Sequence, residues 1–587
     1  MGAVLYPRSH APAWGGWARI GAMGVAALAG LAQAASLALP GTGQPVWWLQ
    51  CVSMVVLAGL LHRLRPTWRQ GALLGFAFAL AWLCGTFWWL FISLHTYGGL
   101  AAPLAVAAVV ALAAFLAIYY AFALGLFSLL APANKALAAM LFAALWLLAE
   151  LLRGTWFTGF PWGAGGYAHV QGPLSSLPRV VGVYGVGAIS AGLAMALVQC
   201  RWRDLRHWRT WVVALVLLGA GGFAWVQRHC AVELCHTPVQ AAKAPLKLAL
   251  LQGNIPQDEK FEQGSGVPLA LAWYAEQLRS ETASLVVAPE TAIPLLPQQL
   301  IPGYLEGLQA RYIQGDQAAL LGIPLGNARE GYTNSVLGWR PAAGAAPEPA
   351  YVYHKHHLVP FGEFIPPLFK WFTEMLNIPL GDFNRGTLGQ PSFEWLGQRI
   401  APNICYEDLF GEELAARFAA PAQAPTVLVN FSNIGWFGNT LAVDQHLQIS
   451  RMRALELERP MVRATNTGAT VIIDHRGVVT HALERFSRGV LRGKCTGAGW
   501  GCRAMLPSRP LPGGLRAGGC GRCGCLLAWV WRPAGWAGAA ARRLRLDAGH
   551  AGTGSPTSNE GVYAPVTTLT LDNRGPQPGA TVARTMI

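Results

Sequence analysis

The chain has few charged residues for its length. Asp, Glu, Lys and Arg make up 12% of its 587 residues, whereas hydrophobic residues make up 53%. Soluble globular domains carry about a quarter charged residues. The composition therefore excludes an ordinary soluble protein and places much of the chain in lipid.

The sequence also lacks a nucleic-acid-binding motif and a disulfide framework. Its net charge of +15 would suit a nucleic-acid partner. Many arginines, however, lie in short loops between apolar runs, so we expect no nucleic acid. Five of the 11 cysteines fall between Cys495 and Cys525, and the others are scattered, mostly in apolar runs. This spacing is not that of a disulfide scaffold.

A series of apolar runs fills the first 226 residues. Most of them reach or approach the roughly 20 residues that span a bilayer, and so many in succession cannot all be core helices of a soluble protein. We predict a membrane domain over residues 1–230 with seven spanning helices. The runs lie at about 20–39, 46–61, 72–94, 100–130, 136–152, 183–200 and 210–226.

Basic residues are distributed unevenly among the loops between these runs. Arginines cluster at 63–69 and at 201–209, whereas the loops 40–45 and 95–99 carry no Lys or Arg. Because basic loops stay in the cytoplasm, the N-terminus is predicted to be cytoplasmic and the segment after residue 226 to lie on the far side.

An aromatic loop, GTWFTGFPWGAGGYAHVQGPLSSLP, occupies residues 154–178 on that far side. Aromatic residues at this level are typical of an interfacial belt. An entrance for a lipid substrate is the alternative, and we favour the belt.

From residue 244 the chain becomes more polar, and strands alternate with helices. One stretch, IAPNICYEDLFGEEL, places Cys405 after a strand-like segment and before an acidic helix start. The first amides of a helix favour a thiolate, so Cys405 is a candidate nucleophile. An inert buried cysteine is the alternative.

Two other strand-like stretches also end in chemically useful residues. SLVVAPE ends at Glu290 and YVYHK ends at Lys355. We expect one sheet edge to bring both residues next to Cys405. A carboxylate can take the thiol proton, a lysine can hold an oxyanion, and the thiolate can attack a carbonyl.

These three residues resemble the Glu-Lys-Cys triad of the nitrilase superfamily. Spanning runs followed by such a domain resemble, more narrowly, the apolipoprotein N-acyltransferases. This resemblance implies a multi-pass α-helical membrane domain plus an α/β nitrilase-like αββα sandwich over 244–490. The matching motifs are GFPW (159–162), QGNIPQ (252–257), PETAIP (289–294), KHHLVPFGEFIP (355–366), ICYE (404–407), NFSNIGWFG (430–438), QHLQISRMRALELERP (445–460) and RATNTG (463–468).

The resemblance also implies an activity. An acyl chain would pass from a phospholipid, phosphatidylethanolamine, to Cys405 as a thioester, and then to the N-terminal amine of a diacylated lipoprotein. The enzyme would lie in a bacterial inner membrane with its catalytic domain in the periplasm, and it would need no cofactor. A membrane-anchored amidohydrolase that uses water, and a transporter with a non-catalytic domain, are the alternatives.

Several residues are expected to support the site. Glu363, Tyr406 and Glu407 follow from the resemblance, and Phe261 stands where the family commonly has a tryptophan. The alternative for Glu407 is a charge at the N-terminus of a helix. Asn430 and Trp436 are expected to line the pocket, because the NFSN strand should neighbour that of Cys405.

The histidines at 354, 356 and 357 resemble a metal cluster, but we expect no metal. On a strand, His354 and His356 share one face while Lys355 points the other way. No Cys or acidic partner stands at zinc spacing.

The composition changes abruptly near residue 492, where Gly, Arg, Trp and Cys become dense. The resemblance implies an eighth spanning helix here, but the best candidate, 526–541, is interrupted by Arg532 and Pro533. We interpret residues 492–587 as an atypical tail, translated out of frame, in place of that helix.

Overall fold

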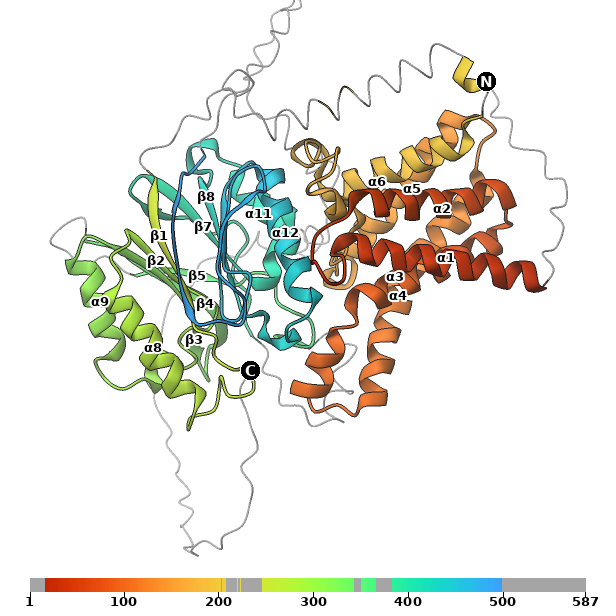
Figure 1. The fold of residues 1–587 in the computed structure, drawn as a ribbon. Coiled ribbons are helices and arrows are strands. Elements are labelled where there is room, and N and C mark those ends of the chain that lie inside the picture. The colour runs from red at the N-terminus through yellow and green to blue at the C-terminus, as the bar shows by residue number, and fades with distance from the viewer. Residues whose placement is uncertain are drawn as a thin grey trace, which may run out of the picture. The chain divides into compact units, whose positions relative to one another are not determined.

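The computed structural model describes residues 16–201, 203–206, 219, 222, 245–342, 350–365 and 383–498. Within them, six helices are long and apolar enough to cross a membrane (Figure 1). They correspond to the first six predicted runs, and the seventh run, apart from residues 219 and 222, lies outside the described residues. The helices are α1 (Gly16–Leu37), α2 (Trp47–Leu64), α3 (Trp68–Phe87), α4 (Ala102–Leu130), α5 (Lys135–Thr155) and α6 (Pro178–Gln199).

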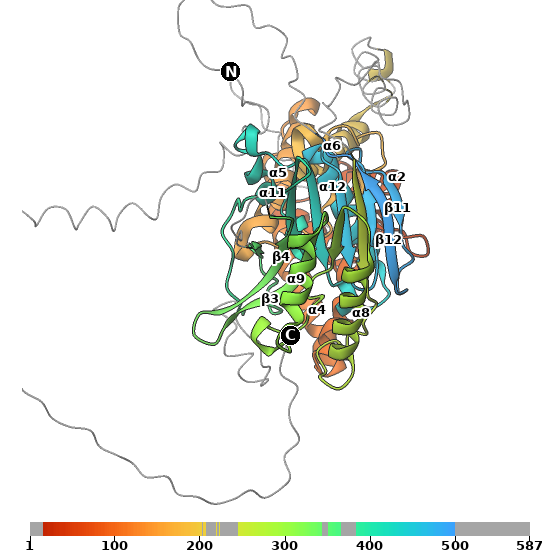
Figure 2. The same cartoon turned by 90° about the vertical axis from the view of Figure 1, so that its left-hand side faces the viewer.

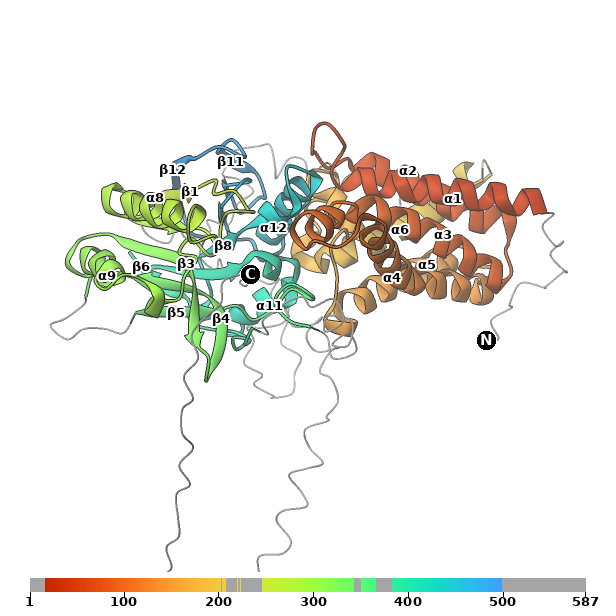
Figure 3. The ribbon, with the colours of Figure 1, turned by 90° about the horizontal axis from the view of Figure 1, so that it is seen from below.

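Glycines let these helices pack closely. A Cβ atom on Gly30 of α1 would lie 2.1 Å from the carbonyl oxygen of Phe78 in α3, and one on Gly75 would lie 2.7 Å from that of Tyr120 in α4. Lipid supplies no hydrophobic force between helices, so close backbone contact has to hold them together. Figure 3 shows α1 running beside α2 and α3.

The third run is shorter as a helix than predicted. α3 ends at Phe87, and a turn leads into the π-helical segment η1 (Ile92–Tyr97). In the turn, Trp89 donates its Nε1–H to Gln445 Oε1 of the polar domain at 3.0 Å.

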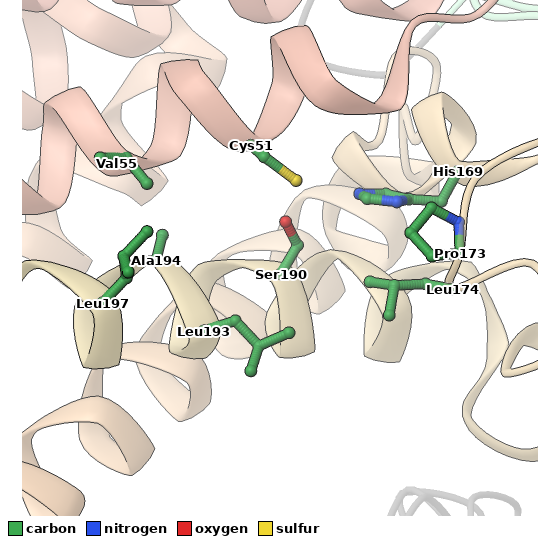
Figure 4. A pocket seen from close by; sticks show the side chains of 9 residues that line it. All are labelled: Cys51, Val55, His169, Pro173, Leu174, Ser190, Leu193, Ala194 and Leu197. Atoms are coloured by element: carbon green, nitrogen blue, oxygen red, sulfur yellow. The ribbon is translucent and has the colours of Figure 1, made fainter. Parts of the chain in front are cut away.

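A cavity of about 170 Å³ lies between α2 and α6 (Figure 4). Cys51, His169 and Ser190 form its polar end, and aliphatic side chains form the rest. His169 and Ser190 both bond to Gln50 Oε1, at 3.0 and 2.6 Å. The lining residues all belong to the membrane domain.

The polar domain contains two six-stranded sheets. Central strands such as β1, β2 and β8 are buried on both faces, which explains apolar runs such as LKLALLQ. The first sheet has the order β12 (Gly489–Cys495), β1 (Leu246–Gln252), β2 (Leu285–Ala288), β3 (Ala318–Asn327), β4 (Gly331–Trp339) and β5 (Tyr351–His354). The second has the order β11 (Val479–Ala482), β10 (Val471–Ile473), β9 (Met461–Thr465), β8 (Val427–Ser432), β7 (Gln398–Ile404) and β6 (Phe393–Trp395).

The sheets face each other, and helices cover their outer faces (Figure 2). Leu248 and Leu250 of β1 point into the core between the sheets. Ala249 and Leu251 point to the opposite face, towards the outer helices α8 and α9 whose bounds follow. This alternation is the two-residue period of a strand. The outer helices are α8 (Gly266–Ser280) and α9 (Tyr304–Gln314) on the first sheet, and α11 (Gly411–Ala415) and α12 (Leu441–Leu457) near the second. The predicted αββα sandwich is confirmed.

The sandwich extends beyond its predicted end at residue 490. β12 pairs with β1 in antiparallel register as far as Cys495, opposite Leu246. Ala498 then donates its N–H to the carbonyl oxygen of Thr426 at 3.1 Å. Residues 491–498 therefore belong to the sandwich and not to the atypical tail, whose remainder lies outside the described residues.

Candidate active site

Cys405 occupies a sharp turn between β7 and the short helix η8 (Cys405–Leu409). Its φ of +52° is unusual for a residue with a side chain and marks a constrained position. The carbonyl oxygen accepts hydrogen bonds from Asn430 Nδ2 at 3.2 Å and lies 3.3 Å from His446 Nε2. Ser432 Oγ donates to the sulfur at 3.4 Å. These contacts fix the thiol at the end of the second sheet.

Glu290 lies just after β2, in the first sheet, and is buried. Its Oε1 accepts from Asn334 Nδ2 at 2.8 Å and from Lys355 Nζ at 3.3 Å, and its Oε2 accepts from the Asn433 N–H at 2.8 Å. Burial opposes ionisation, but Lys355 and these hydrogen bonds outweigh it and hold the pKa of Glu290 below its ordinary value.

Lys355 lies directly after β5 and is 1% exposed. Its Nζ lies between two carboxylates and donates to Glu363 Oε1 at 2.8 Å as well as to Glu290. Burial lowers the pKa of the ammonium group, but Glu363 and Glu290 together raise it above its ordinary value. Lys355 is therefore a permanent cation at neutral pH.

The three predicted residues do come together, but not along one sheet edge. Glu290 and Lys355 follow strands of the first sheet, whereas Cys405 follows a strand of the second. The thiol accepts from Ser432 Oγ, and the next residue, Asn433, donates its N–H to Glu290 Oε2, which links the two sheets at this point. Both Glu290 and Lys355 are close enough to affect the pKa of the thiol. Strand ends alone could not reveal this, because the assignment of strands to two sheets is a tertiary property.

The predicted stabilised thiolate is wrong for the resting site. Burial, followed by the Glu290 carboxylate, raises the pKa of the Cys405 thiol to about 12, and Lys355 offsets only part of this. η8 has five residues, so its N-terminus provides little positive potential. The thiol is neutral until a proton acceptor removes its proton.

Glu407 is buried and accepts several hydrogen bonds, so it is not a solvent-exposed charge at the N-terminus of a helix. Its Oε2 accepts from the Ile404 N–H at 2.6 Å, beside the nucleophile. Its Oε1 accepts from the His356 N–H at 2.6 Å, and both oxygens accept from Tyr353 O–H. Glu407 thus ties the loop that carries Lys355 to the strand that carries Cys405.

Tyr406, the residue after Cys405, contacts the membrane domain. Its hydroxyl donates to the carbonyl oxygen of Gly159 at 3.2 Å, and its ring lies 6.2 Å from that of Phe160. Nearby, Trp162 Nε1–H donates to Gln445 Oε1 at 2.8 Å. The GFPW motif is therefore a contact between the two domains.

The aromatic loop is mostly buried, so its interpretation as an interfacial belt is wrong for residues 161–170. A buried ion pair between Glu150 and Arg153, at 2.8 Å, holds it. Arg153 donates to the carbonyl oxygens of Phe160 and Trp162, and Glu150 accepts the Gly165 N–H. Charges inside a membrane domain need such partners, and here the backbone of the loop supplies them.

Three of the residues expected to support the site fall into two groups: Phe261 and Trp436 belong to an aromatic cluster, and Asn430 lies on β8 beside Cys405. The rings of Phe261 and Trp436 stack at 6.5 Å, and Tyr97 of η1 meets Trp436 edge-on at 5.7 Å. Asn430 lies opposite Asn403 in the β7–β8 pairing and bonds to its side chain at 2.7 Å. Asn430 therefore supports the backbone of the nucleophile.

The three histidines have separate partners. His354 Nδ1 lies 2.8 Å from Ser335 Oγ, and His356 Nδ1 lies 2.7 Å from the Gly386 carbonyl oxygen. His357 pairs with Glu413 at 2.9 Å. In the described part of the chain, no group of three His, Cys, Asp or Glu residues is placed to hold a metal.

Sequence reasoning missed two members of this site, Asn334 and Lys260. Asn334 on β4 bridges the carboxylates of Glu290 and Glu363, at 2.8 and 2.9 Å. Lys260, 1% exposed, donates to the Glu290 carbonyl oxygen at 3.2 Å. The sequence signal for Asn334 was a polar residue inside the otherwise apolar run YTNSVLGW. No local pattern distinguishes Lys260 from other lysines.

Comparisons with known proteins match both domains. A family model for the apolipoprotein N-acyltransferase N-terminal domain matches residues 26–196, and one for carbon-nitrogen hydrolase matches residues 247–501. An amidase from Nesterenkonia sp., known from a crystal structure, is 15% identical and covers 43% of this chain and 90% of its own, with a TM-score of 0.30.

Relatives of this chain cover it more completely. The apolipoprotein N-acyltransferase of Verminephrobacter eiseniae is 66% identical over 481 residues, which are 81% of this chain and 89% of the relative. That of Ralstonia nicotianae is 45% identical over 458 residues, 77% of this chain and 84% of the relative. On this identity and coverage, the chain belongs to the apolipoprotein N-acyltransferase family.

Proposed function

We propose that this protein transfers an acyl chain from a phospholipid to the N-terminal amine of diacylglyceryl-cysteine in lipoproteins, through a thioester on Cys405. The observation that carries the proposal is the buried Glu290–Lys355–Glu363 cluster that faces the thiol. The residue after this thiol already contacts the membrane domain. Acyl chemistry is thereby located next to lipid.

In the first step, Glu290 accepts the thiol proton while the sulfur attacks the ester carbonyl of the phospholipid. The two events have to be concerted, because the pKa of the thiol is about 12 and that of Glu290 is low. Protonation of Glu290 leaves Lys355 with Glu363 as its anionic partner, so the ammonium group can stabilise the oxyanion. The carbon–oxygen bond then breaks, and Glu290 returns the proton to the lysophospholipid.

In the second step, the α-amine of the acceptor attacks the thioester carbonyl. The carbon–nitrogen bond forms, the carbon–sulfur bond breaks, and Glu290 transfers a proton from nitrogen to sulfur. The products are an amide and the free thiol. Glu363, Asn334 and Glu407 hold the reacting groups in place throughout.

The location of the reaction follows from the charge pattern of the loops. Arginines at 63–69 are expected on the cytoplasmic side, which supports a catalytic domain on the periplasmic side of a bacterial inner membrane. Phosphatidylethanolamine is the proposed donor. Both lipid substrates can then reach the site from the membrane plane.

The test is a two-step reconstitution of the full-length protein in detergent micelles. Incubation with labelled phosphatidylethanolamine should add one acyl mass to Cys405, and a diacylglyceryl-cysteine peptide should then be converted to its N-acyl amide. Cys405→Ala should do neither, whereas Cys200→Ala, which removes an exposed cysteine, should do both. Release of free fatty acid with no amide would refute acyl transfer and indicate hydrolysis.

A further inference from the structure

Lys260 is a buried lysine that has no role in the two-step acyl transfer proposed above. It lies in the turn between β1 and α8 and is 1% exposed. Its Nζ donates to the Glu290 carbonyl oxygen at 3.2 Å and to Thr291 Oγ1 at 3.0 Å. Burying an ammonium group is costly, and neither of these two partners carries a negative charge.

We propose that Lys260 is a second base of the site, which accepts the proton that the acceptor's α-ammonium group must lose before its nitrogen attacks the Cys405 thioester. This inference rests on the proposed acyl transfer. An α-amino group has a pKa of roughly 7.7–8.0, so most acceptor molecules arrive protonated at neutral pH. An ammonium nitrogen has no lone pair with which to attack.

The surroundings of Lys260 suit this role. Burial lowers the pKa of its ammonium group to about 7, although the Glu290 carboxylate after β2 and, when ionised, the Cys405 thiol at the start of η8 oppose the shift. A substantial fraction of Lys260 is then neutral at physiological pH. A neutral amine keeps two N–H donors, enough for Glu290 and Thr291, and gains one lone pair.

The other titratable groups described around the thiol are already committed. His446 lies 2.9 Å from Asp408 Oδ1 through Nε2 and 3.1 Å from Arg463 through Nδ1. Lys355 is held as a cation by two carboxylates. Glu363 accepts hydrogen bonds on both oxygens, from Lys355 and from the Val359 N–H. Glu290 is required for the proton that passes between nitrogen and sulfur. Lys260 remains as the base for the additional proton.

The protons balance in this scheme. One N–H bond of the ammonium group breaks and an Nζ–H bond forms on Lys260, which leaves a neutral amine. Attack forms the carbon–nitrogen bond and breaks the carbon–sulfur bond, while Glu290 moves a second proton to the sulfur. Lys260 then releases its proton to water, so one proton is released for each amide formed.

The experiment separates the two half-reactions in Lys260→Arg and Lys260→Met. Arginine keeps the charge and the donors but offers no lone pair at neutral pH, and methionine keeps most of the volume. Acyl-enzyme is first formed from phosphatidylethanolamine and quantified by mass. It is then discharged by a diacylglyceryl-cysteine peptide or by hydroxylamine, which is largely neutral at neutral pH and needs no base before it attacks.

We expect Lys260→Arg, which keeps a positive charge beside Glu290, to form the thioester at nearly the wild-type rate. Both variants should lose about 100-fold or more in discharge by the peptide, the range of a general base. Discharge by hydroxylamine should be nearly unchanged. Discharge of Lys260→Arg by the peptide should recover at a pH well above the pKa of the amine, where the peptide arrives neutral.

Three results would overturn the inference. Wild-type discharge with an unchanged pH profile in both variants would make Lys260 a structural residue. Equal losses with the peptide and hydroxylamine would make it a support for Glu290. Loss of thioester formation in Lys260→Arg would place its role in donor binding or in the first step. None of these outcomes is the failure of acyl transfer itself, which would appear in the wild-type enzyme.

Discussion

The role of Glu363 can be tested by a single change, Glu363→Gln. The substitution keeps the shape of the side chain and removes its charge. In the wild-type site, Glu363 Oε1 accepts from Lys355 Nζ at 2.8 Å and from Asn334 Nδ2 at 2.9 Å, while Oε2 accepts from the Val359 N–H at 2.9 Å. The new amide has one oxygen, so one of these donors faces an NH₂ group.

The expected loss is intermediate in size. Removing one member of a buried ion pair costs about 3–5 kcal/mol when the other charge is left alone. Lys355 keeps Glu290 at 3.3 Å, so the cost here is closer to that of one hydrogen bond to a charged group, about 1.5–3 kcal/mol. If the transition state bears this loss in full, thioester formation should slow by roughly 10- to 150-fold.

The pH dependence gives a second, independent signature. Glu363 and Glu290 raise the pKa of Lys355 above its ordinary value, so the favourable contribution of this cation is present at neutral pH and is lost only as the pH rises through the raised pKa. Without Glu363 that pKa falls. The alkaline limb of the rate profile should therefore move to lower pH.

The assay is thioester formation from labelled phosphatidylethanolamine, followed by mass across the pH range. Glu394→Gln, which removes an exposed carboxylate on β6, is the matched control and should behave as wild type. A Glu363→Gln enzyme with the wild-type rate and an unchanged alkaline limb would refute the reasoning.

Four further predictions concern the nucleophile, the domain contact, the topology and the tail. Cys405→Ser should leave at most a trace of amide by mass spectrometry, because serine has no comparable anion at neutral pH; substantial activity would contradict the mechanism. Gln445→Leu removes the shared acceptor of Trp89 and Trp162 and should cost about 1–3 kcal/mol for each stranded donor; an unchanged melting temperature would argue against it. A periplasm-specific reporter should be silent after Arg65 and active after residue 226, and the reverse would invert the topology. Resequencing should reveal a frameshift close to residue 501, where the family match ends; a confirmed frame would end that hypothesis.

Much of the site was visible in the sequence because its parts are local. Glu290, Lys355 and Cys405 each follow a short apolar strand, and such strands can be recognised from a few neighbouring residues. The long apolar runs are equally local, and six of them are the observed helices. The alternation of strands and helices likewise predicts an α/β domain without any knowledge of its contacts.

The electrostatics of the site could not be obtained in this way. The sequence suggested a stabilised thiolate at Cys405, whereas burial beside Glu290 gives a neutral thiol. Glu407 was open to interpretation as a helix charge until its bonds to Ile404 and His356 were known. Desolvation and long-range partners set these properties, and neither follows from neighbours in the chain.

The sequence by itself therefore determined the kinds of elements, the two-domain organisation and the residue types that can carry acyl chemistry. Only the tertiary structure decided that Glu290, Lys355 and Cys405 come from two sheets, that the GFPW loop is buried against Tyr406, and that Lys260 lies beside Glu290. The physical reason is the distance along the chain over which each effect acts. Periodicity and turn chemistry act over a few residues, whereas burial and charge pairing depend on groups that folding brings together from distant parts of the chain.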